Sequence, residues 1–254
     1  MKSNTISNAM ILIHDDIRQI VEDAGLPLRR LSGKRLLLTG ASGYLASYMA
    51  DTVVWLNDHL LSTPCSIICL VRSAVTLDGR LGHLLGRNDV QFVQQDVSAP
   101  IHLDRHIDFI VHAASRASPK NYLAHPIDTM DANVIGTRQL LQIAKEQGIE
   151  SFLFFSSGEI YGEVDYKVSA ISENYPGQVD CTSPRACYTE AKRYGETQCV
   201  AFWREHRVPV KIVRPFHVYG PGLRLDDGRV IADFLQNRLR NEPIRVSSDG
   251  SGIR

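Results

Sequence analysis

Tyr188 and Lys192 are the residues whose types and spacing point most directly to chemistry in this sequence. They stand four positions apart in a segment with helical periodicity, so their side chains share one face of the expected helix. A phenol with its ordinary pKa of about 10 is a poor base near neutral pH. A neighbouring ammonium group favours the phenolate, which can remove a proton. The pair therefore suggests a general base, with an exposed helical pair as the alternative.

Two hydroxyls upstream support that interpretation. The apolar run SFLFFS (151–156) has the composition of a buried strand; its last residue is Ser156, and Ser157 follows it. A serine at the end of such a strand can hydrogen-bond the oxygen on which a base acts. The serines and the Tyr188–Lys192 pair follow one another in the order that a single α/β fold requires.

A glycine-rich turn near the start of the chain is a candidate phosphate site. The segment TGASGYLA (39–46) lies between an expected strand and an expected helix. Glycines let the backbone turn sharply and approach a pyrophosphate, while the following helix directs free N–H groups and its positive dipole end at the anion. A plain tight turn is the alternative. The residues expected to hold a cofactor here are Gly40, Ser42, Gly43, Tyr44 and Leu45.

The elements that must position these residues alternate along the chain. Continuous apolar strands separated by helices indicate a parallel sheet covered on both faces, an α/β doubly wound fold of the Rossmann type. The expected strands cover 35–39, 66–71, 90–94, 107–112, 151–156 and 208–214, and the main helices cover 43–61, 126–147 and 185–206. Residues 10–24 predict an additional amphipathic helix before this fold.

Composition excludes several classes of function. The 254 residues contain 28 Lys plus Arg and 28 Asp plus Glu, so there is no net basic charge for a nucleic-acid partner. No apolar run is long enough to span a membrane, and the polar start lacks the features of a secretion signal. Five cysteines with unpaired spacing indicate reduced thiols, and we expect a cytoplasmic protein. His102 and His106 lack further ligands, so we expect no metal site.

From about Lys34 onward, the chain resembles the extended short-chain dehydrogenases, in particular the NAD-dependent epimerase/dehydratase family. Within that family it resembles the UDP-glucuronate decarboxylase branch most. The likeness rests on the segments HAASRASPKNY (112–122), NVIGT (133–137), SSGEIYG (156–162), PRACYTEAKRYGET (184–197), RPFHVYGPG (214–222) and DDGRVIADF (226–234).

The resemblance implies a role for each residue of a catalytic set. Tyr188 removes the proton of a sugar 4-hydroxyl while C4 gives hydride to a nicotinamide. Lys192 holds the cofactor ribose and lowers the pKa of Tyr188, and Ser157 hydrogen-bonds the 4-oxygen. Glu159 stands where decarboxylases and dehydratases keep a glutamate beside C5. The alternative for Glu159 is a solvent-facing residue after a strand.

The resemblance also implies two binding sites, a partner and a division into domains. We expect bound NAD, a nucleotide-sugar substrate and a homodimer formed by the helices at 126–147 and 185–206. Residues 1–30 are expected to form an N-terminal helical extension, 31–215 the NAD(P)-binding domain, and 216–254 the start of a smaller, truncated substrate lobe. The cofactor set gains Arg72, Asp96, Val97, Ala113, Ala114, Ser115, Asn133 and Pro215 together with Tyr188 and Lys192, and the substrate set is Ser118, Lys120, Tyr122, His217 and Arg229.

Several positions depart from the family. Gly158 replaces the acidic residue with which 4,6-dehydratases protonate a leaving hydroxyl, which disfavours standard dehydration. Arg72 stands where NAD-specific relatives have an aspartate, so NADP is admitted as well as NAD. His217 replaces the usual asparagine. The chain stops at Arg254, where family members continue into the rest of the substrate lobe.

Four functions remain open from the sequence. The first is C4 oxidation followed by chemistry at C5 or C6, as in UDP-glucuronate decarboxylation. The second is 4-epimerisation or 4,6-dehydration of a nucleotide sugar. The third is an NADPH-dependent carbonyl or thioester reductase, since the strand ending CLVR (69–72) resembles that of thioester reductases. The fourth is a non-catalytic, cofactor-binding protein.

Overall fold

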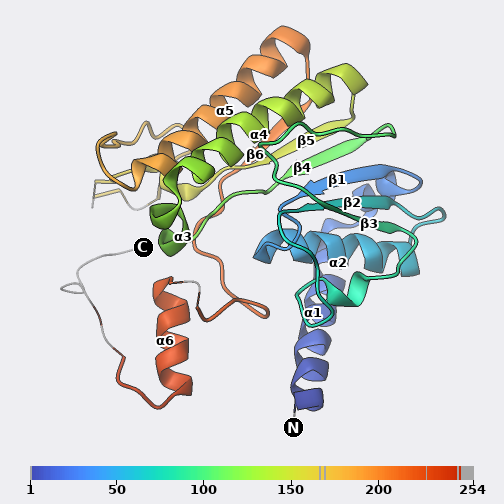
Figure 1. Cartoon of the computed structure of the whole chain (residues 1–254), viewed down its shortest axis with the longest axis horizontal. Helices are drawn as coiled ribbons and strands as arrows, with labels where there is room; N and C mark the ends of the chain where they lie inside the picture. The colour runs from blue at the N-terminus through green and yellow to red at the C-terminus, as the bar shows by residue number, and fades with distance from the viewer. Residues whose placement is uncertain (1, 166, 169, 227, 245, 247–254) are drawn as a thin grey trace.

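Six parallel strands form one sheet in the order β3-β2-β1-β4-β5-β6 (Figure 1). The computed structural model describes residues 2–165, 167–168, 170–226, 228–244 and 246, with the backbone alone for 2–10. The strands are β1 (Arg35–Thr39), β2 (Ser66–Val71), β3 (Val90–Gln94), β4 (Phe109–His112), β5 (Ser151–Phe155) and β6 (Val210–Val213). The doubly wound fold expected from the alternating pattern is confirmed.

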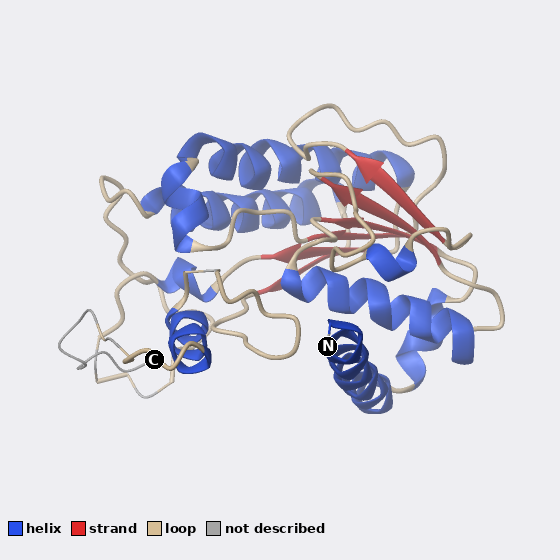
Figure 2. Ribbon diagram, turned by 60° about the horizontal axis from the view of Figure 1, so that its bottom comes forward, coloured by secondary structure: helices blue, strands red, loops and turns tan. Residues whose placement is uncertain are grey.

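Helices cover both faces of this sheet (Figure 2). One face carries α2, and the other carries α4 and α5; α1 packs on the outer side of α2. The helices are α1 (Lys2–Ala24), α2 (Tyr44–His59), α3 (Pro119–Ala124), α4 (Pro126–Gln147), α5 (Ala186–His206) and α6 (Val230–Leu239), with single turns η1 (Leu26–Leu31), η2 (Gly82–Leu84) and η3 (Gly158–Tyr161).

The alternation of side chains along the strands divides the core in two. On β1, Leu37 points into the cluster shared with α4 and α5, whereas Leu36 and Leu38 point into the cluster shared with α2. All three are at most 4% exposed. Full burial of each such side chain contributes about 1.5–3 kcal/mol to the free energy of unfolding. A strand that is apolar on both faces can bury all of these side chains only in the middle of a sheet that is covered on both sides.

The expected bounds of the six strands and of α2, α4 and α5 agree with the structure to within a few residues. Helix α4 ends at Gly148, whose φ of 63° lets its N–H bond back to Ala144. Helix α1 begins at Lys2, earlier than the residue 10 that the apolar spacing predicts. The pattern did not predict α3 or α6, which are short and flanked by loops. Across the described residues, no helix combines the length and the apolar character that crossing a membrane requires.

The topology determines where a ligand belongs. From β1 the chain moves outward through β2 to β3, then crosses back and places β4 on the other side of β1. In such sheets the crevice lies at the carboxyl ends of the strands, at the point where the direction of winding reverses. That point here lies between the loop after β1 and the loop after β4.

Candidate active site

The loop after β1 is pressed against the end of β4. Gly40 has a φ of 65°, and a Cβ atom there would lie 2.6 Å from Cα of Ala114. The loop is closed by a hydrogen bond from the Gly43 N–H to the Gly40 oxygen at 2.8 Å. Glycine at position 40 is therefore required both by its backbone angle and by the close approach.

The start of α2 is left open for an anion. Its N-cap residue is Gly43, which has no side chain to accept from the first amides, and the first turn holds no acidic residue. The N–H groups at Tyr44 and Leu45 therefore remain at a helix N-terminus with its positive dipole end. This arrangement fits the pyrophosphate of a dinucleotide, as the glycine pattern predicts.

Tyr188 lies at the other side of the crevice, 5% exposed on α5. Burial raises the pKa of its phenol most, and the charge of Glu159 raises it further. A hydrogen bond from Ser157 and the charge of Arg229 lower the pKa of Tyr188. Both of these stabilise the phenolate, so the structure brings together the proposed base, the serine and a cation that the sequence places 41 positions away.

Lys192 is buried on the same helix, 2% exposed. Its ammonium group donates to the Phe155 carbonyl at the end of β5 and lies 5.9 Å from the centre of the Tyr188 ring. Burial lowers the pKa of Lys192 to about 7. The lysine therefore lies one turn from the tyrosine as expected, while the groups that lower the pKa of Tyr188 are Ser157 and Arg229.

Glu159 forms an ion pair that the sequence analysis did not anticipate. Its two carboxylate oxygens lie 3.0 and 3.1 Å from Nη2 of Arg185. Arg185 precedes Tyr188 by three positions, so it projects from the start of the same helix face. Its guanidinium also lies over the ring of Tyr122, 5.7 Å from the centre. The i, i+3 spacing of Arg185 and Tyr188 was the signal that could have identified this cation.

Tyr122 stacks on Tyr188 with ring centres 5.1 Å apart and planes 12° apart. It is 1% exposed, and burial raises the pKa of its phenol. Tyr122 was expected to face a nucleotide sugar, which stays a prediction. The structure stacks its ring on that of the proposed base, where it limits the tilt of the Tyr188 ring.

Buried polar atoms without a partner concentrate around this crevice. Among the described residues these atoms are Arg116 Nε, Tyr122 Oη, Asn133 Oδ1 and Ser156 Oγ. Tyr122 lies on α3 and Asn133 on α4, Ser156 directly follows β5, and Arg116 lies in the loop between β4 and α3. A buried group without a hydrogen bond is costly, and such groups in a cleft are explained when a polar ligand supplies the partners. The crevice thus fits a polar cofactor that lies along these strand ends.

A buried histidine joins the strands beneath the crevice. His112 Nδ1 lies 2.8 Å from Thr39 Oγ1, and His112 Nε2 lies 3.1 Å from Thr137 Oγ1. Thr137 donates its own proton to the Asn133 carbonyl, so it accepts from Nε2–H, and Thr39 donates to Nδ1. Burial lowers the pKa of His112 to about 3, so the ring is neutral. This chain of hydrogen bonds links β1 to β4 and β4 to α4.

The remaining expected cofactor residues lie at neighbouring strand ends. Arg72 follows β2 and is exposed, while Asp96 and Val97 follow β3. Asp96 accepts from the Ser98 backbone and side chain and lies in the field of Arg72 and Arg116. Ala113, Ala114 and Ser115 follow β4, Asn133 donates to Ser115 from α4, and Pro215 follows β6.

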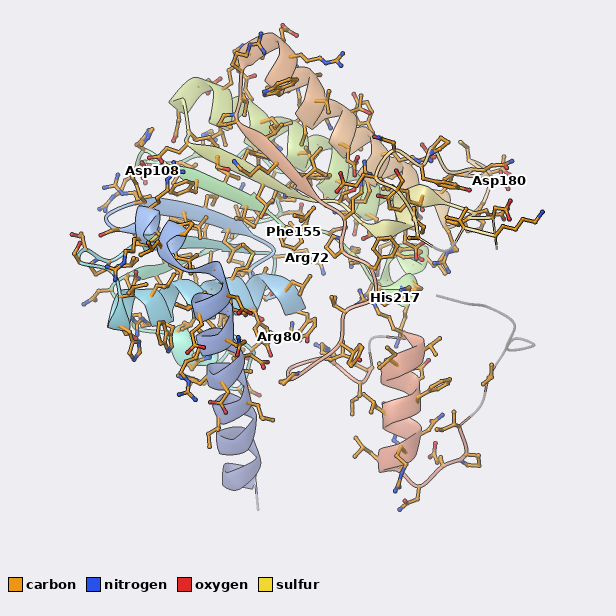
Figure 3. All side chains as sticks on the ribbon, turned by 180° about the vertical axis from the view of Figure 1, so that it is seen from behind. Arg72, Arg80, Asp108, Phe155, Asp180 and His217 are labelled. Carbon is orange, nitrogen blue, oxygen red and sulfur yellow. The ribbon has the colours of Figure 1, made fainter. Side chains whose placement is uncertain are left out.

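The expected substrate residues divide into two groups. Ser118 is the buried N-cap residue of α3, and Lys120, two residues later, is exposed. Arg229 begins α6, with Nη2 3.5 Å from the Ala117 carbonyl, so α6 reaches the α3 region. His217 is exposed on the segment between β6 and α6, beside the strand ends (Figure 3).

The chain is similar to known enzymes over most of its length. It is 34% identical over 221 residues to UDP-glucuronic acid decarboxylase 1 of Xenopus tropicalis, which covers 87% of this chain and 50% of that protein. It is also 34% identical over 230 residues to UDP-glucuronic acid decarboxylase 1 of Arabidopsis thaliana, covering 91% and 49%. The chain thus spans about half the length of the curated relatives it matches.

Solved structures share its fold. The UDP-glucose 4-epimerase of Thermotoga maritima, solved with UDP-glucose, matches with a TM-score of 0.70 and 25% identity over 85% of this chain and 66% of that one. A dTDP-glucose 4,6-dehydratase of Streptomyces venezuelae, solved with NAD, matches with a TM-score of 0.71 and 25% identity, covering 86% and 66%. Residues 36–254 match the family of NAD dependent epimerases and dehydratases. The chain therefore belongs to the NAD dependent epimerase/dehydratase family.

Proposed function

We propose that this chain carries the cofactor site and catalytic set of an NAD-dependent enzyme that oxidises C4 of a nucleotide sugar and acts at C5 or C6, with UDP-glucuronate decarboxylation as the reaction. The observation that carries the proposal is the Glu159–Arg185 ion pair beside Tyr188. The names of the relatives support the same choice.

The cofactor is assigned to the loop after β1 and the strand ends beside it. Gly40 and Gly43 bring backbone amides to the pyrophosphate, and the unpartnered atom of Asn133 supplies an acceptor farther along the crevice. When bound, NAD supplies the acceptor for the hydride of C4. Arg72 stands where NAD-specific relatives have the carboxylate that binds the ribose 2′-hydroxyl. Its positive charge suits a 2′-phosphate, so NADP remains the second candidate cofactor.

Tyr188 acts on the sugar oxygen. Its phenolate accepts the proton of the 4-hydroxyl, and Ser157 stabilises that oxygen by donating a hydrogen bond. The buried site limits water, so each of these interactions is stronger than on the surface. A fixed donor beside the reacting oxygen costs no reorganisation during the step.

Arg185 and Glu159 make a carboxylated sugar the preferred substrate. We assign to Arg185 the binding of the C5 carboxylate, because a guanidinium fork matches a carboxylate in geometry and charge. With a ketone at C4, the C5–C6 bond can break, CO2 can leave, and the electron pair moves toward the carbonyl oxygen. C5 then takes up a proton, and we assign its delivery from solvent to Glu159. C4 finally takes back the hydride while Tyr188 returns its proton to the 4-oxygen, which gives a UDP-pentose and regenerates NAD.

The loop after β5 argues against 4,6-dehydration. At Gly158 an added Cβ would lie 2.8 Å from the Phe216 ring, so an acidic side chain there requires that ring to move. A 4-epimerase remains the second candidate among nucleotide-sugar enzymes. It needs Tyr188, Ser157 and room for the ketone to turn, and the Glu159 carboxylate beside them has no role in that reaction, although its desolvation is costly.

A homodimer is part of the proposal. Several large apolar side chains on the outer surfaces of α4 and α5 are 40–52% exposed. These are Ile135, Tyr194, Val200 and Trp203. Such a pair of helices supports a four-helix interface, and light scattering at micromolar concentration would measure the expected dimer mass.

The test is a product assay with matched glutamate variants. Wild type with NAD and UDP-glucuronate should release CO2 and form a UDP-pentose, detected by mass spectrometry. Glu159→Gln keeps the side-chain shape and removes the charge, so it should stop formation of the UDP-pentose while nicotinamide absorbance still increases on adding the sugar. Glu190→Gln alters a surface pair with Arg193 and is the control. A plain C4 epimer, formed equally well by Glu159→Gln, would contradict the proposal.

A further inference from the structure

The loop 219–223 connects the proposed cofactor-binding domain (31–215), called the cofactor half below, with the segment that leads to α6. It lies against the loop after β1 (residues 40–43, called the phosphate loop below) and the start of α2. These contacts join segments that are far apart in the sequence. An added Cβ at Gly220 would lie 2.7 Å from the Tyr44 hydroxyl. The two loops are therefore in direct contact at the site where the cofactor pyrophosphate is assigned.

Arg80 bridges these two loops with one guanidinium group. Nη1 donates to the Ser42 carbonyl at 2.8 Å, and Nη2 donates to the Gly222 carbonyl at 2.6 Å. The group also lies 5.8 Å from the centre of the Tyr44 ring. A planar guanidinium holds two acceptors in fixed geometry, which a lysine cannot do. Figure 3 shows Arg80 beside this junction.

The N-terminal helix makes a second tie to the same loop. The Tyr48 hydroxyl lies 3.0 Å from Asp16 Oδ2 and 3.1 Å from the Pro221 carbonyl, so one proton is shared between two acceptors. Burial and the bond to Asp16 raise the pKa of Tyr48 well above its usual value, which keeps the donor protonated. Next to this contact, Ile17 is 2% exposed, which anchors α1.

We propose that Arg80 and the Asp16–Tyr48 pair are positioning residues that couple the phosphate loop to the loop 219–223, so that NAD binding orders the start of the segment that carries the expected substrate residue Arg229. The inference rests on the proposed function, because it assigns the cofactor to the phosphate loop. It gives α1 a role in the reaction although the helix lies outside residues 36–254, which match the family.

The restraint on the loop 219–223 follows from where the two ties end. Both reach backbone carbonyls of the loop 219–223 rather than side chains, so they fix the path of the chain and do not depend on its sequence. The phosphate-loop end of the Arg80 tie is the carbonyl of Ser42, one residue before Gly43 at the open start of α2. An anion that fixes this turn therefore also fixes the acceptor of Arg80, and the second bond of the same guanidinium transmits the restraint.

Hydrogen exchange with and without NAD tests the coupling. In wild type, saturating NAD should slow amide exchange in peptides that cover 219–223 by about fivefold or more, the lower range of typical coupling energies. In Arg80→Ala that protection should be lost, although NAD still binds. Arg80→Lys keeps the charge without the two-pronged geometry, so it should lose most of the protection. Tyr48→Phe removes a single hydroxyl and should lose part of it.

Arg87→Lys is the matched control. Arg87 belongs to the same connection between β2 and β3, but it binds Asp58 and Asp89 away from the loops. It should keep the full NAD-dependent protection, whatever its effect on the melting temperature. Unchanged protection in Arg80→Ala and Tyr48→Phe, with NAD bound, would overturn the inference alone. Absence of NAD binding to wild type would overturn the cofactor assignment and the inference with it.

Discussion

The cofactor half and the segment 216–246 are built on different principles. Every residue of β1 and β2 after the first is buried, and the loop that follows β1 leaves no space for a Cβ atom at Gly40. In the segment 216–246, Ala232 is the one buried residue among those described. Apolar burial thus fixes the first region, while polar ties through Arg80, Tyr48 and Arg229 hold the second.

A pair of glycine variants should show this difference most strongly. Gly40→Ala forces a Cβ into the Ala114 backbone at positive φ and should reduce the free energy of unfolding by about 2–5 kcal/mol. Gly228 has a similar positive φ of 75°, but its added Cβ meets Lys120 at an ordinary 3.5 Å, so Gly228→Ala should cost about 1–2 kcal/mol. Urea unfolding measures both. Equal losses of stability in the two variants would show that the cofactor half is no more tightly packed than the segment 216–246.

A substitution at the base should separate chemistry from packing in the cofactor half. Tyr188→Phe keeps the stacked ring and removes the hydroxyl, so turnover should fall roughly 10²-fold or more. The dissociation constant of NAD and the melting temperature should change little. Turnover close to that of wild type would remove Tyr188 from the proposed mechanism.

The pH dependence of stability should report the buried lysine. The pKa of Lys192 is about 7 in the folded chain, against 10.5 as the ordinary value. Between these values the unfolded chain binds the additional proton, so the lysine makes stability rise as pH increases from 7 to 10.5. In that pH range, Lys192→Met should lower the slope of the free energy of unfolding against pH by up to about 1.4 kcal/mol per pH unit, the value for one proton. Denaturant unfolding of wild type and Lys192→Met at several pH values measures this slope. Identical slopes in the two proteins would show that the Lys192 ammonium group is in contact with water in the folded chain.

The regions also differ in how far their structure follows from the sequence. Strands such as Ser66–Val71 were predicted because burial on both faces requires a continuous apolar run, and the glycine loop because its turn and helix are local. The pairing of Glu159 with Arg185 joins residues 26 positions apart through a loop whose path no periodicity specifies. Arg80 was missed for the same reason, since its partners lie 38 and 142 positions away.

Partner identity also determines the electrostatics. The sequence places Lys192 beside Tyr188, and it correctly predicts their shared helix face. It does not reveal that the Lys192 ammonium group donates to the Phe155 carbonyl, or that Arg229 approaches Tyr188 from the start of α6. Those contacts depend on how β5 and α6 end in space, so the pKa of the tyrosine could be anticipated only in outline.

The position of β1 in the middle of the sheet has a consequence for how the chain is made. Its first neighbour, β2, follows after about one helix, but β4 joins its other edge only at Phe109–His112. The pairing partners Arg35 and Asp108 are separated by 73 positions. During synthesis, one edge of the central strand therefore stays open until β4 emerges, and slow non-local pairing is the step at which aggregation competes. Conditions that slow elongation past β4 should lower the soluble yield before they affect the activity of each folded molecule.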